Sequence, residues 1–280
     1  MSELEHQDVK SYPSLGQSWG LFGFTLLATV VVAILVAVVY LVLLAIGRES
    51  VATVLLTSAF SKLVMYALPF VIVIWLALRK KKSVELDFQF NFSATSLITM
   101  LLIVLATWSI YFLIDPVVDL IPMPKFFENL MLQLLSDHGV WSILMLVAAA
   151  PICEELLFRG IILDGLLKRY SPTKAIIWSA VLFGLVHLNP WQLLAAFTLG
   201  AFMGWIYYRT GSVLVTMFIH FVANGTGVLL GWLLVPDPTQ MVTTREMVGS
   251  NVLYFGLLAA NALLLVVLLS SLKKQFAKSA

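Results

Sequence analysis

Two adjacent glutamates and an arginine lie inside an apolar stretch of the sequence. Glu154, Glu155 and Arg159 fall within residues 140–163, whose other side chains are typical of a membrane-spanning helix. A charged side chain near the centre of such a helix costs about 2.5–3.5 kcal/mol or more on insertion scales, so it usually pairs with another group or serves a function. Pro151 precedes them, removes a backbone hydrogen bond and predicts a kink.

Later apolar segments add His187, and His220 with Asn224. With a helical rise of about 1.5 Å per residue, Glu154, His187 and His220 each lie roughly 14–21 Å from the inner end of their segments. The sequence therefore predicts three helices that bring ionisable groups to a comparable depth, reachable from the side where the basic residues gather. A lone membrane histidine is usually a hydrogen-bonded packing residue. The combination instead favours a functional centre, either hydrolytic, metal-binding or transporting.

Helical periodicity divides the two carboxylates. Residues four apart share a helix face, so Glu155 faces the same way as Arg159, and His220 the same way as Asn224. Glu154 and Glu155 are rotated by about 100° and cannot aim at one point. We therefore predict that Glu155 and Arg159 form a structural ion pair, which alone would be an interhelical clamp, and that Glu154 faces the histidines.

The composition is that of an integral membrane protein. Of the 280 residues, 61% are hydrophobic and 11% are charged, whereas soluble domains average about 25% charged residues. The apolar runs do not alternate, which excludes a membrane β-barrel and predicts an all-α, polytopic bundle. The single cysteine, Cys153, excludes an internal disulfide and is predicted to be a buried helix residue rather than a nucleophile. We expect about eight transmembrane helices: 21–46, 58–78, 94–114, 140–163, 174–188, 191–208, 212–235 and 251–272.

Basic residues set the expected orientation. Four of them at 79–82 lie between the second and third segments, which places that loop in the cytoplasm. Alternation then puts both termini in the cytoplasm and 12 of the 17 basic residues on that side. The predicted organisation is a cytoplasmic tail (1–20), three helices with an interfacial segment and outer loop (21–139), a catalytic core (140–235), and a final helix with a basic tail (236–280).

Two weaker patterns concern assembly. Residues 84–92 alternate apolar and polar, which favours an extended interfacial segment whose phenylalanines dip into lipid. The pairs Gly200/Gly204 and Gly227/Gly231 predict close helix packing.

Three short motifs resemble those of the CPBP (Abi) intramembrane proteases, a family that includes the CAAX prenyl endopeptidases of the Rce1 type. The resemblance covers roughly residues 140–235 and implies an eight-helix bundle. It rests on Glu154-Glu155-x-x-x-Arg159, Phe183-x-x-x-His187 and His220-x-x-x-Asn224.

The resemblance implies a role for each matched residue. Glu154 would be the general base that activates a water, assisted by His187, and His220 with Asn224 would stabilise the oxyanion. The supporting residues would be Glu155, Arg159 and Phe183. This set suits peptide hydrolysis, which needs a positioned base and preorganised donors to a tetrahedral oxyanion.

Metal dependence is open at this point. Glu154, His187 and His220 could also form a three-ligand zinc site with an open position for water. No H-E-x-x-H sequence is present, and Asn224 suits an oxyanion role better than ligation. We favour a metal-independent glutamic mechanism without a cofactor, with zinc as the alternative.

The sequence thus predicts an intramembrane endopeptidase acting on a peptide or protein at the lipid bilayer, with no nucleic-acid partner. The alternative is a non-catalytic membrane scaffold or bacteriocin-immunity protein with the same bundle. A transporter is a third reading, but no internal repeat supports it. The resemblance allows several substrates: a prenylated CAAX protein, a peptide pheromone or a bacteriocin. The basic-residue bias and short N-terminal tail fit a multi-pass protein of a bacterial plasma membrane.

Overall fold

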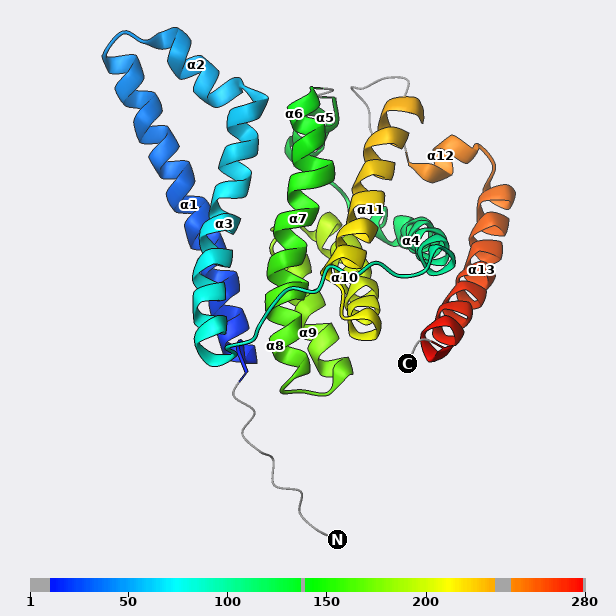
Figure 1. The fold of residues 1–280 in the computed structure, drawn as a ribbon. Helices are drawn as coiled ribbons and strands as arrows, with labels where there is room; N and C mark the ends of the chain where they lie inside the picture. The colour runs from blue at the N-terminus through cyan, green and yellow to red at the C-terminus, as the bar shows by residue number, and fades with distance from the viewer. Residues whose placement is uncertain (1–10, 137–138, 235–242, 279–280) are drawn as a thin grey trace.

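A computed structural model describes residues 11–136, 139–234 and 243–278, and within these ranges the chain is helical with no β-strand (Figure 1). Each of the eight predicted segments falls on a helix. Three shorter helices, α2, α5 and α12, occupy connections that the sequence did not predict to be helical. The α-helices are α1 (Leu15–Ala45), α2 (Glu49–Thr57), α3 (Ala59–Val84), α4 (Leu97–Val118), α5 (Lys125–Ser136), α6 (Val140–Ile143), α7 (Ala150–Glu155), α8 (Asp164–Leu167), α9 (Pro172–Leu185), α10 (Pro190–Thr210), α11 (Val213–Leu234), α12 (Thr244–Val248) and α13 (Asn251–Lys278).

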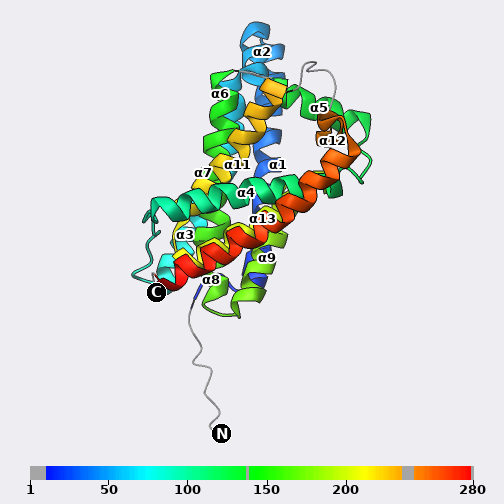
Figure 2. The same cartoon turned by 90° about the vertical axis from the view of Figure 1, so that its right-hand side faces the viewer.

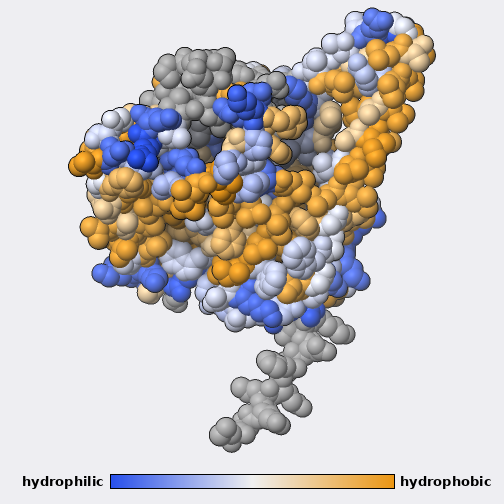
Figure 3. Space-filling model, turned by 180° about the vertical axis from the view of Figure 1, so that it is seen from behind, coloured by the Kyte–Doolittle hydropathy of each residue, from blue (hydrophilic) through white to orange (hydrophobic). Residues whose placement is uncertain are grey.

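The surface is that of a polytopic membrane bundle, as predicted. By length and composition, five helices can cross a membrane: Leu15–Ala45, Phe60–Val84, Leu97–Val118, Val213–Leu230 and Asn251–Lys278. The first and last of these bury only 11% of their most apolar window inside the protein, so most of their side chains face outward. Figure 3 shows hydrophobic side chains across the middle of the rear face and hydrophilic ones along its lower edge, the pattern that a bilayer requires.

The helices enclose a core around residues 140–167. In Figure 1, α1, α2 and α3 form a hairpin at one edge that leans away from α6 at the upper end. The helices α9, α10 and α11 pack on the other side, and α4 with α13 closes the opposite edge. Figure 2 shows that α4 runs almost across the direction of α1 and α11. The most deeply buried residues belong to the stretch 157–166 and to α9, α10 and α11.

A partly buried ion cluster ties the lower end of the bundle together. Lys81, fully buried at the end of α3, places Nζ 2.6 Å from the Tyr12 carbonyl oxygen, 2.7 Å from Asp164 Oδ2 and 3.0 Å from Glu85 Oε1. Lys168 Nζ lies 2.5 Å from Glu85 Oε2 and 2.8 Å from the same Asp164 oxygen. We call these five residues the Lys81 cluster. It joins the N-terminal segment, α3 and the end of α8.

The connection after α3 is extended, as predicted, but it packs differently. Residues 88–96 cross the lower part of the bundle without regular structure (Figure 1). The Phe90 ring lies so close to Gly160 that a Cβ there would be 2.5 Å from Phe90 Cε1. The Asn91 carbonyl accepts a hydrogen bond from the Val213 N–H at 2.9 Å. The expectation that this phenylalanine dips into lipid was therefore wrong, because Gly160 leaves a space in the core that its ring fills.

Candidate active site

The helix that carries the two glutamates is continuous over 140–167 but changes pitch twice. It is π-helical at η1 (Leu144–Ala149) and again at η2 (Leu156–Leu163), and α7 between them holds both carboxylates. Pro151 is the second residue after η1. A proline has no N–H and its ring crowds the preceding turn, which the wider π-helical turn accommodates. The wider turns also leave backbone carbonyls without their usual partners.

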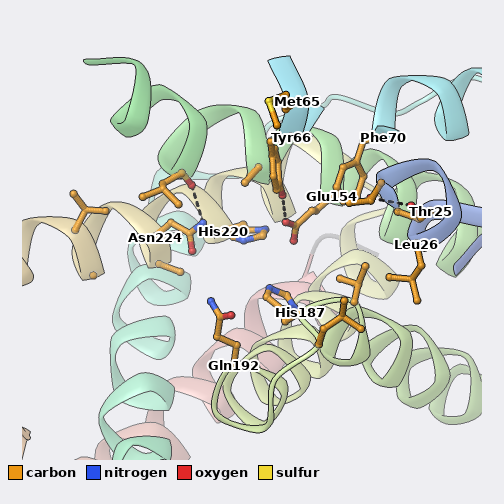
Figure 4. A pocket seen from close by; sticks show the side chains of 18 of the residues that line it. Thr25, Leu26, Met65, Tyr66, Phe70, Glu154, His187, Gln192, His220 and Asn224 are labelled. Carbon is orange, nitrogen blue, oxygen red and sulfur yellow. Dashed lines mark hydrogen bonds between the residues drawn. The ribbon is translucent and has the colours of Figure 1, made fainter. Parts of the chain in front are cut away.

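The four predicted catalytic residues line one cavity of about 500 Å³ (Figure 4). Glu154 comes from α7, His187 follows α9, and His220 with Asn224 lies on α11. Figure 4 shows the Glu154 carboxylate and both imidazoles around a common space. The remaining wall is largely apolar and comes from α1, α3 and α4 as well. Three helices outside the motif region therefore help to form the cavity.

The Glu154 side chain is nearly buried, and only one of its two carboxylate oxygens has a hydrogen-bond partner among the described residues. Its Oε1 accepts a short hydrogen bond from the Tyr66 hydroxyl on α3, drawn as a dashed line in Figure 4. Its Oε2 is buried and has no hydrogen-bond partner among the described residues. An unpaired buried carboxylate oxygen is costly, so it marks a position where a water or ligand is expected to bind.

Glu155 lies at the centre of a second contact set, behind the cavity. Its Oε1 is 2.8 Å from Arg159 Nη1, so the predicted ion pair is present, and both side chains are fully buried. The same oxygen is 3.0 Å from His220 Nδ1. This third partner was not predicted. Glu155 thus joins the arginine to an imidazole that faces the cavity.

Phe183 packs between the charged groups. The Arg159 guanidinium lies 4.2 Å from the centre of the Phe183 ring, a cation–π arrangement, and Nη2 donates to the Gly200 carbonyl at 3.2 Å. The ring also meets the imidazoles of His187 and His220 edge-on, with centroids 5.4 and 5.6 Å away. Phe183 therefore supports both histidines by packing.

Backbone contacts fix the His187 ring. Its Nδ1 is 2.9 Å from the Phe183 carbonyl oxygen, which can only accept, so Nδ1 carries the proton. Neutral His187 then presents an unprotonated Nε2. The Glu155 carboxylate acts in the same way on His220. In their neutral forms, both histidines offer acceptors at Nε2, and each becomes a donor there only when protonated.

Asn224 is anchored by the π-helical stretch. Its Nδ2 donates to the Leu146 carbonyl at 2.8 Å, within η1 (Figure 4). One of the two amide hydrogens is used in this contact, which leaves the second for another acceptor.

The turn between α9 and α10 adds residues that sequence reasoning missed. Gln192 lines the cavity, and its side chain is hydrogen-bonded by Asn189, whose Nδ2 also donates to the His187 carbonyl at 2.9 Å. Leu188 between them has a φ of 56°, the left-handed region that leucine rarely adopts. A polar Gln and an Asn-Pro turn next to His187 were the available signals.

The cavity extends away from the Lys81 cluster. Met65 and Tyr66 lie on the part of α3 that is remote from Lys81. In the same way, Leu146 lies beyond Glu154, and Gly227 beyond His220, on the side away from the Lys81 cluster. On the other side of Glu154, the chain is packed with fully buried residues such as Leu157, Phe158 and Ile161. The sequence predicted access from the basic side, whereas the described lining residues face the opposite half of the bundle.

The prediction of close helix packing holds for one of the two glycine pairs. A Cβ on Gly200 would be 3.0 Å from Phe183 Cδ1, and one on Gly204 would be 3.1 Å from Ile176 Cγ2, so this pair does allow close packing of α9 on α10. Gly227 has nothing within 4 Å, because it borders the cavity, and the packing prediction was wrong there. Cys153 is free and buried, in agreement with the prediction.

Zinc accepts the kinds of ligand atom found in the cavity, because both histidines present Nε2 to it. The Nδ1 atom of each ring is held by an oxygen, as is usual for histidines that bind a metal. However, within the described ranges no three His, Cys, Asp or Glu side chains are grouped so that they could hold one metal ion. The geometry alone therefore assigns no ligand set.

A comparison with protein families points to the region that contains the cavity. Residues 136–226 match the family described as type II CAAX prenyl endopeptidase Rce1-like, and the match includes Glu154, His187, His220 and Asn224. This part of the chain is thus similar to the Rce1-like proteases of the CPBP family. The Bacillus subtilis (strain 168) protein named "Putative membrane peptidase YdiL" is 35% identical over 74 residues, which are 26% of this chain and 30% of that protein. The chain thus matches less than a third of this relative's length. No solved structure is significantly similar to the chain.

Proposed function

We propose that this protein is an intramembrane endopeptidase that uses a glutamate-activated water. The observation that carries the proposal is the Glu154 carboxylate, which lines the cavity with one oxygen anchored by Tyr66 and the other buried without a partner. Two imidazoles and one amide line the same cavity. A base and oxyanion donors are the groups that peptide hydrolysis needs.

In the first step, Glu154 Oε2 takes a proton from a water molecule while the water oxygen bonds to the carbonyl carbon of the substrate. Unprotonated Nε2 of His187 accepts a hydrogen bond from the same water and holds it in place. The carbonyl π electrons move to the oxygen, which becomes an oxyanion. General base catalysis of this kind contributes about 10²–10⁴-fold in rate.

The oxyanion needs hydrogen-bond donors. His220 donates from Nε2 when its ring is protonated, and Glu155 Oε1 accepts the hydrogen bond from its Nδ1 at 3.0 Å. Asn224 donates the amide hydrogen that Leu146 does not use. The intermediate then collapses, the C–N bond breaks, and Glu154 returns its proton to the leaving amine. One donor of this type is worth about 10²–10³ in kcat.

The surroundings restrict the substrate class. The cavity lies within a bundle of apolar helices, so the scissile bond belongs to a peptide or protein at the membrane. A prenylated CAAX protein, a peptide pheromone and a bacteriocin all meet that condition. The similarity to a Bacillus protein supports a bacterial plasma membrane location.

The test compares protein N-termini by mass spectrometry in cells that express wild type, Glu154→Gln or Glu49→Gln. Glu49 is an exposed carboxylate at the start of α2 and serves as the control. We expect termini that disappear in Glu154→Gln, by about 10²-fold or more in abundance, and persist in Glu49→Gln. Identical termini in all three strains would contradict the proposal and favour a non-catalytic scaffold or immunity role.

Metal dependence is tested on the purified protein with a peptide that spans the terminus found in cells. The glutamic mechanism predicts that a strong chelator leaves cleavage unchanged. Loss of cleavage on chelation, with recovery on adding Zn²⁺, would replace it with a zinc mechanism at Glu154, His187 and His220.

A further inference from the structure

We propose that Tyr66 is a positioning residue for Glu154, and that its hydroxyl selects Oε2 as the oxygen that takes the proton from water. The inference deepens the proposed function and rests on it. It extends the site beyond the matched region, because Tyr66 lies on α3, 88 residues before Glu154 and outside residues 136–226.

The contact has a clear chemical direction. A carboxylate oxygen can only accept, so the Tyr66 O–H donates to Glu154 Oε1. In Figure 4 the phenol ring stands above the carboxylate, on the side away from His187. No other described side chain hydrogen-bonds to either oxygen of Glu154. The hydroxyl is therefore the one hydrogen-bonding anchor of this carboxylate within the described ranges.

Packing holds the tyrosine in turn. Its ring lies 5.5 Å from that of Phe70, one helical turn further along α3, and Phe70 is part of the buried core. A glutamate has three rotatable bonds and would otherwise sample several rotamers in a cavity of this size. A fixed hydroxyl on a packed helix removes that freedom and keeps Oε2 in a single place.

Positioning of this kind acts on the rate rather than on binding. A misplacement of about 1 Å costs about 10²-fold when a base must reach its proton in a defined geometry. The hydroxyl is committed to Glu154 and is not directed at the substrate, so KM is not expected to depend on it.

A second tyrosine provides a matched control. Tyr254 on α13 is buried outside the cavity, and its hydroxyl has no hydrogen-bond partner among the described residues. Tyr66→Phe and Tyr254→Phe each remove one buried hydroxyl. Only the first change frees Glu154.

The experiment measures steady-state cleavage of a quenched-fluorescence peptide that spans a Glu154-dependent terminus, with purified protein in liposomes. We expect Tyr66→Phe to lower kcat by about 10–100-fold with KM within about two-fold of wild type. Tyr254→Phe should retain wild-type kcat, and replacing Tyr66 by 3-fluorotyrosine, which keeps the hydroxyl, should give a kcat close to that of wild type. A Tyr66→Phe variant with wild-type kcat, or with an altered KM only, would overturn the inference.

A spectroscopic measurement keeps the inference testable without any activity. The infrared difference between wild type and Glu154→Gln isolates the carboxyl band of Glu154, and this band should shift in Tyr66→Phe but not in Tyr254→Phe. An unshifted band overturns the anchor. The two failures are distinguishable: full cleavage by Glu154→Gln rejects the protease proposal, whereas loss in Glu154→Gln with full activity in Tyr66→Phe rejects only the role of Tyr66.

Discussion

The protein buries charge in two places, and the two differ in how completely the charges are paired. In the Lys81 cluster, one ammonium contacts three oxygens, and both oxygens of Glu85 have a lysine partner. In and behind the cavity, Glu154 Oε2, Glu155 Oε2 and Arg159 Nε are buried without a hydrogen-bond partner among the described residues. The first arrangement ties chain segments together. In the second, Glu154 Oε2 lies at the cavity, where water or substrate can complete its hydrogen bonds.

Location follows the same division. The Lys81 cluster joins the ends of α3 and α8 to the N-terminal segment, and Asp164 is ten residues from Glu154, about 15 Å along the helix. Glu154 and Glu155 lie on α7, between two π-helical stretches, and Arg159 lies in the second of these, η2. The Lys81 cluster, in which the charges are paired, therefore holds chain segments together. The residues with unpaired polar atoms lie at the candidate active site.

The largest stability effect is expected from Arg159→Met. The change leaves Glu155 buried with only His220 to offset its charge, and breaking a buried ion pair in this way costs about 3–5 kcal/mol. Thermal unfolding in detergent should show a midpoint lower by roughly 10 °C. Cleavage should also fall, because Glu155 and Phe183 lose the group that holds them.

The control for this variant is Arg48→Met, which changes an exposed arginine at the start of α2 and should leave the midpoint unchanged. An Arg159→Met protein as stable as wild type would mean that the ion pair contributes nothing to the fold. The contrast between the Lys81 cluster and the residues around the cavity would then not hold.

A smaller loss is expected from Lys81→Met. Lys168 still contacts Glu85 and Asp164, so neither carboxylate is left alone, and we expect a loss of about 1–3 kcal/mol. Activity per folded molecule should stay within about two-fold of wild type, because the change is remote from the cavity. Thermal unfolding and peptide cleavage on the same preparation check both statements. If folded Lys81→Met were as inactive as Glu154→Gln, the cluster would have a role in catalysis.

Two glycines in the cavity region predict a difference of similar size. An added methyl at Gly200 would press on Phe183 and on Arg159 Nη2, 3.0 and 3.2 Å away, and overpacking of this kind costs about 1–3 kcal/mol. At Gly227 the methyl meets open space, and the gain in helix propensity is up to about 1 kcal/mol. Gly200→Ala should lower the unfolding midpoint and Gly227→Ala should not. Equal midpoints would mean that the guanidinium can move aside.

Much of this arrangement could be predicted from the sequence. Apolar length gave the eight main helices, and the spacing of four residues gave the Glu155–Arg159 pair, because both follow from local periodicity. Depth along each helix correctly grouped Glu154, His187 and His220, since helical rise is nearly constant.

The remaining features depend on contacts between distant segments. Tyr66 is one of many aromatic residues in an apolar helix, and nothing in its neighbours indicates that it meets Glu154. The basic run at 79–82 indicated orientation, but it could not reveal that Lys81 alone turns inward to Asp164. Phe90 alternates with polar residues as a surface strand would, and only the space beside Gly160 explains its burial.

The smallest expected effect is the pH dependence of the Lys81 cluster. Burial opposes ionisation of Glu85, but hydrogen bonds from Lys168, the Tyr12 N–H and Lys81 lower its pKa overall from 4.5. Its contribution to stability is therefore present above pH 4.5 and is lost as the pH falls through the lowered value. Burial likewise opposes the charge of Lys168, but Asp164 and Glu85 raise its pKa above 10.5, so its contribution is lost only above that pH.

Thermal unfolding of wild type and Glu85→Gln, followed from about pH 3 to 7, measures this contribution. The midpoints should differ by a constant amount above pH 4.5 and converge below it, because wild type loses the charge that the variant never had. Glu49→Gln, which alters an exposed carboxylate, should follow wild type throughout. A difference between wild type and Glu85→Gln that did not change with pH would mean that the hydrogen bonds of Glu85, and not its charge, hold this end of the bundle together.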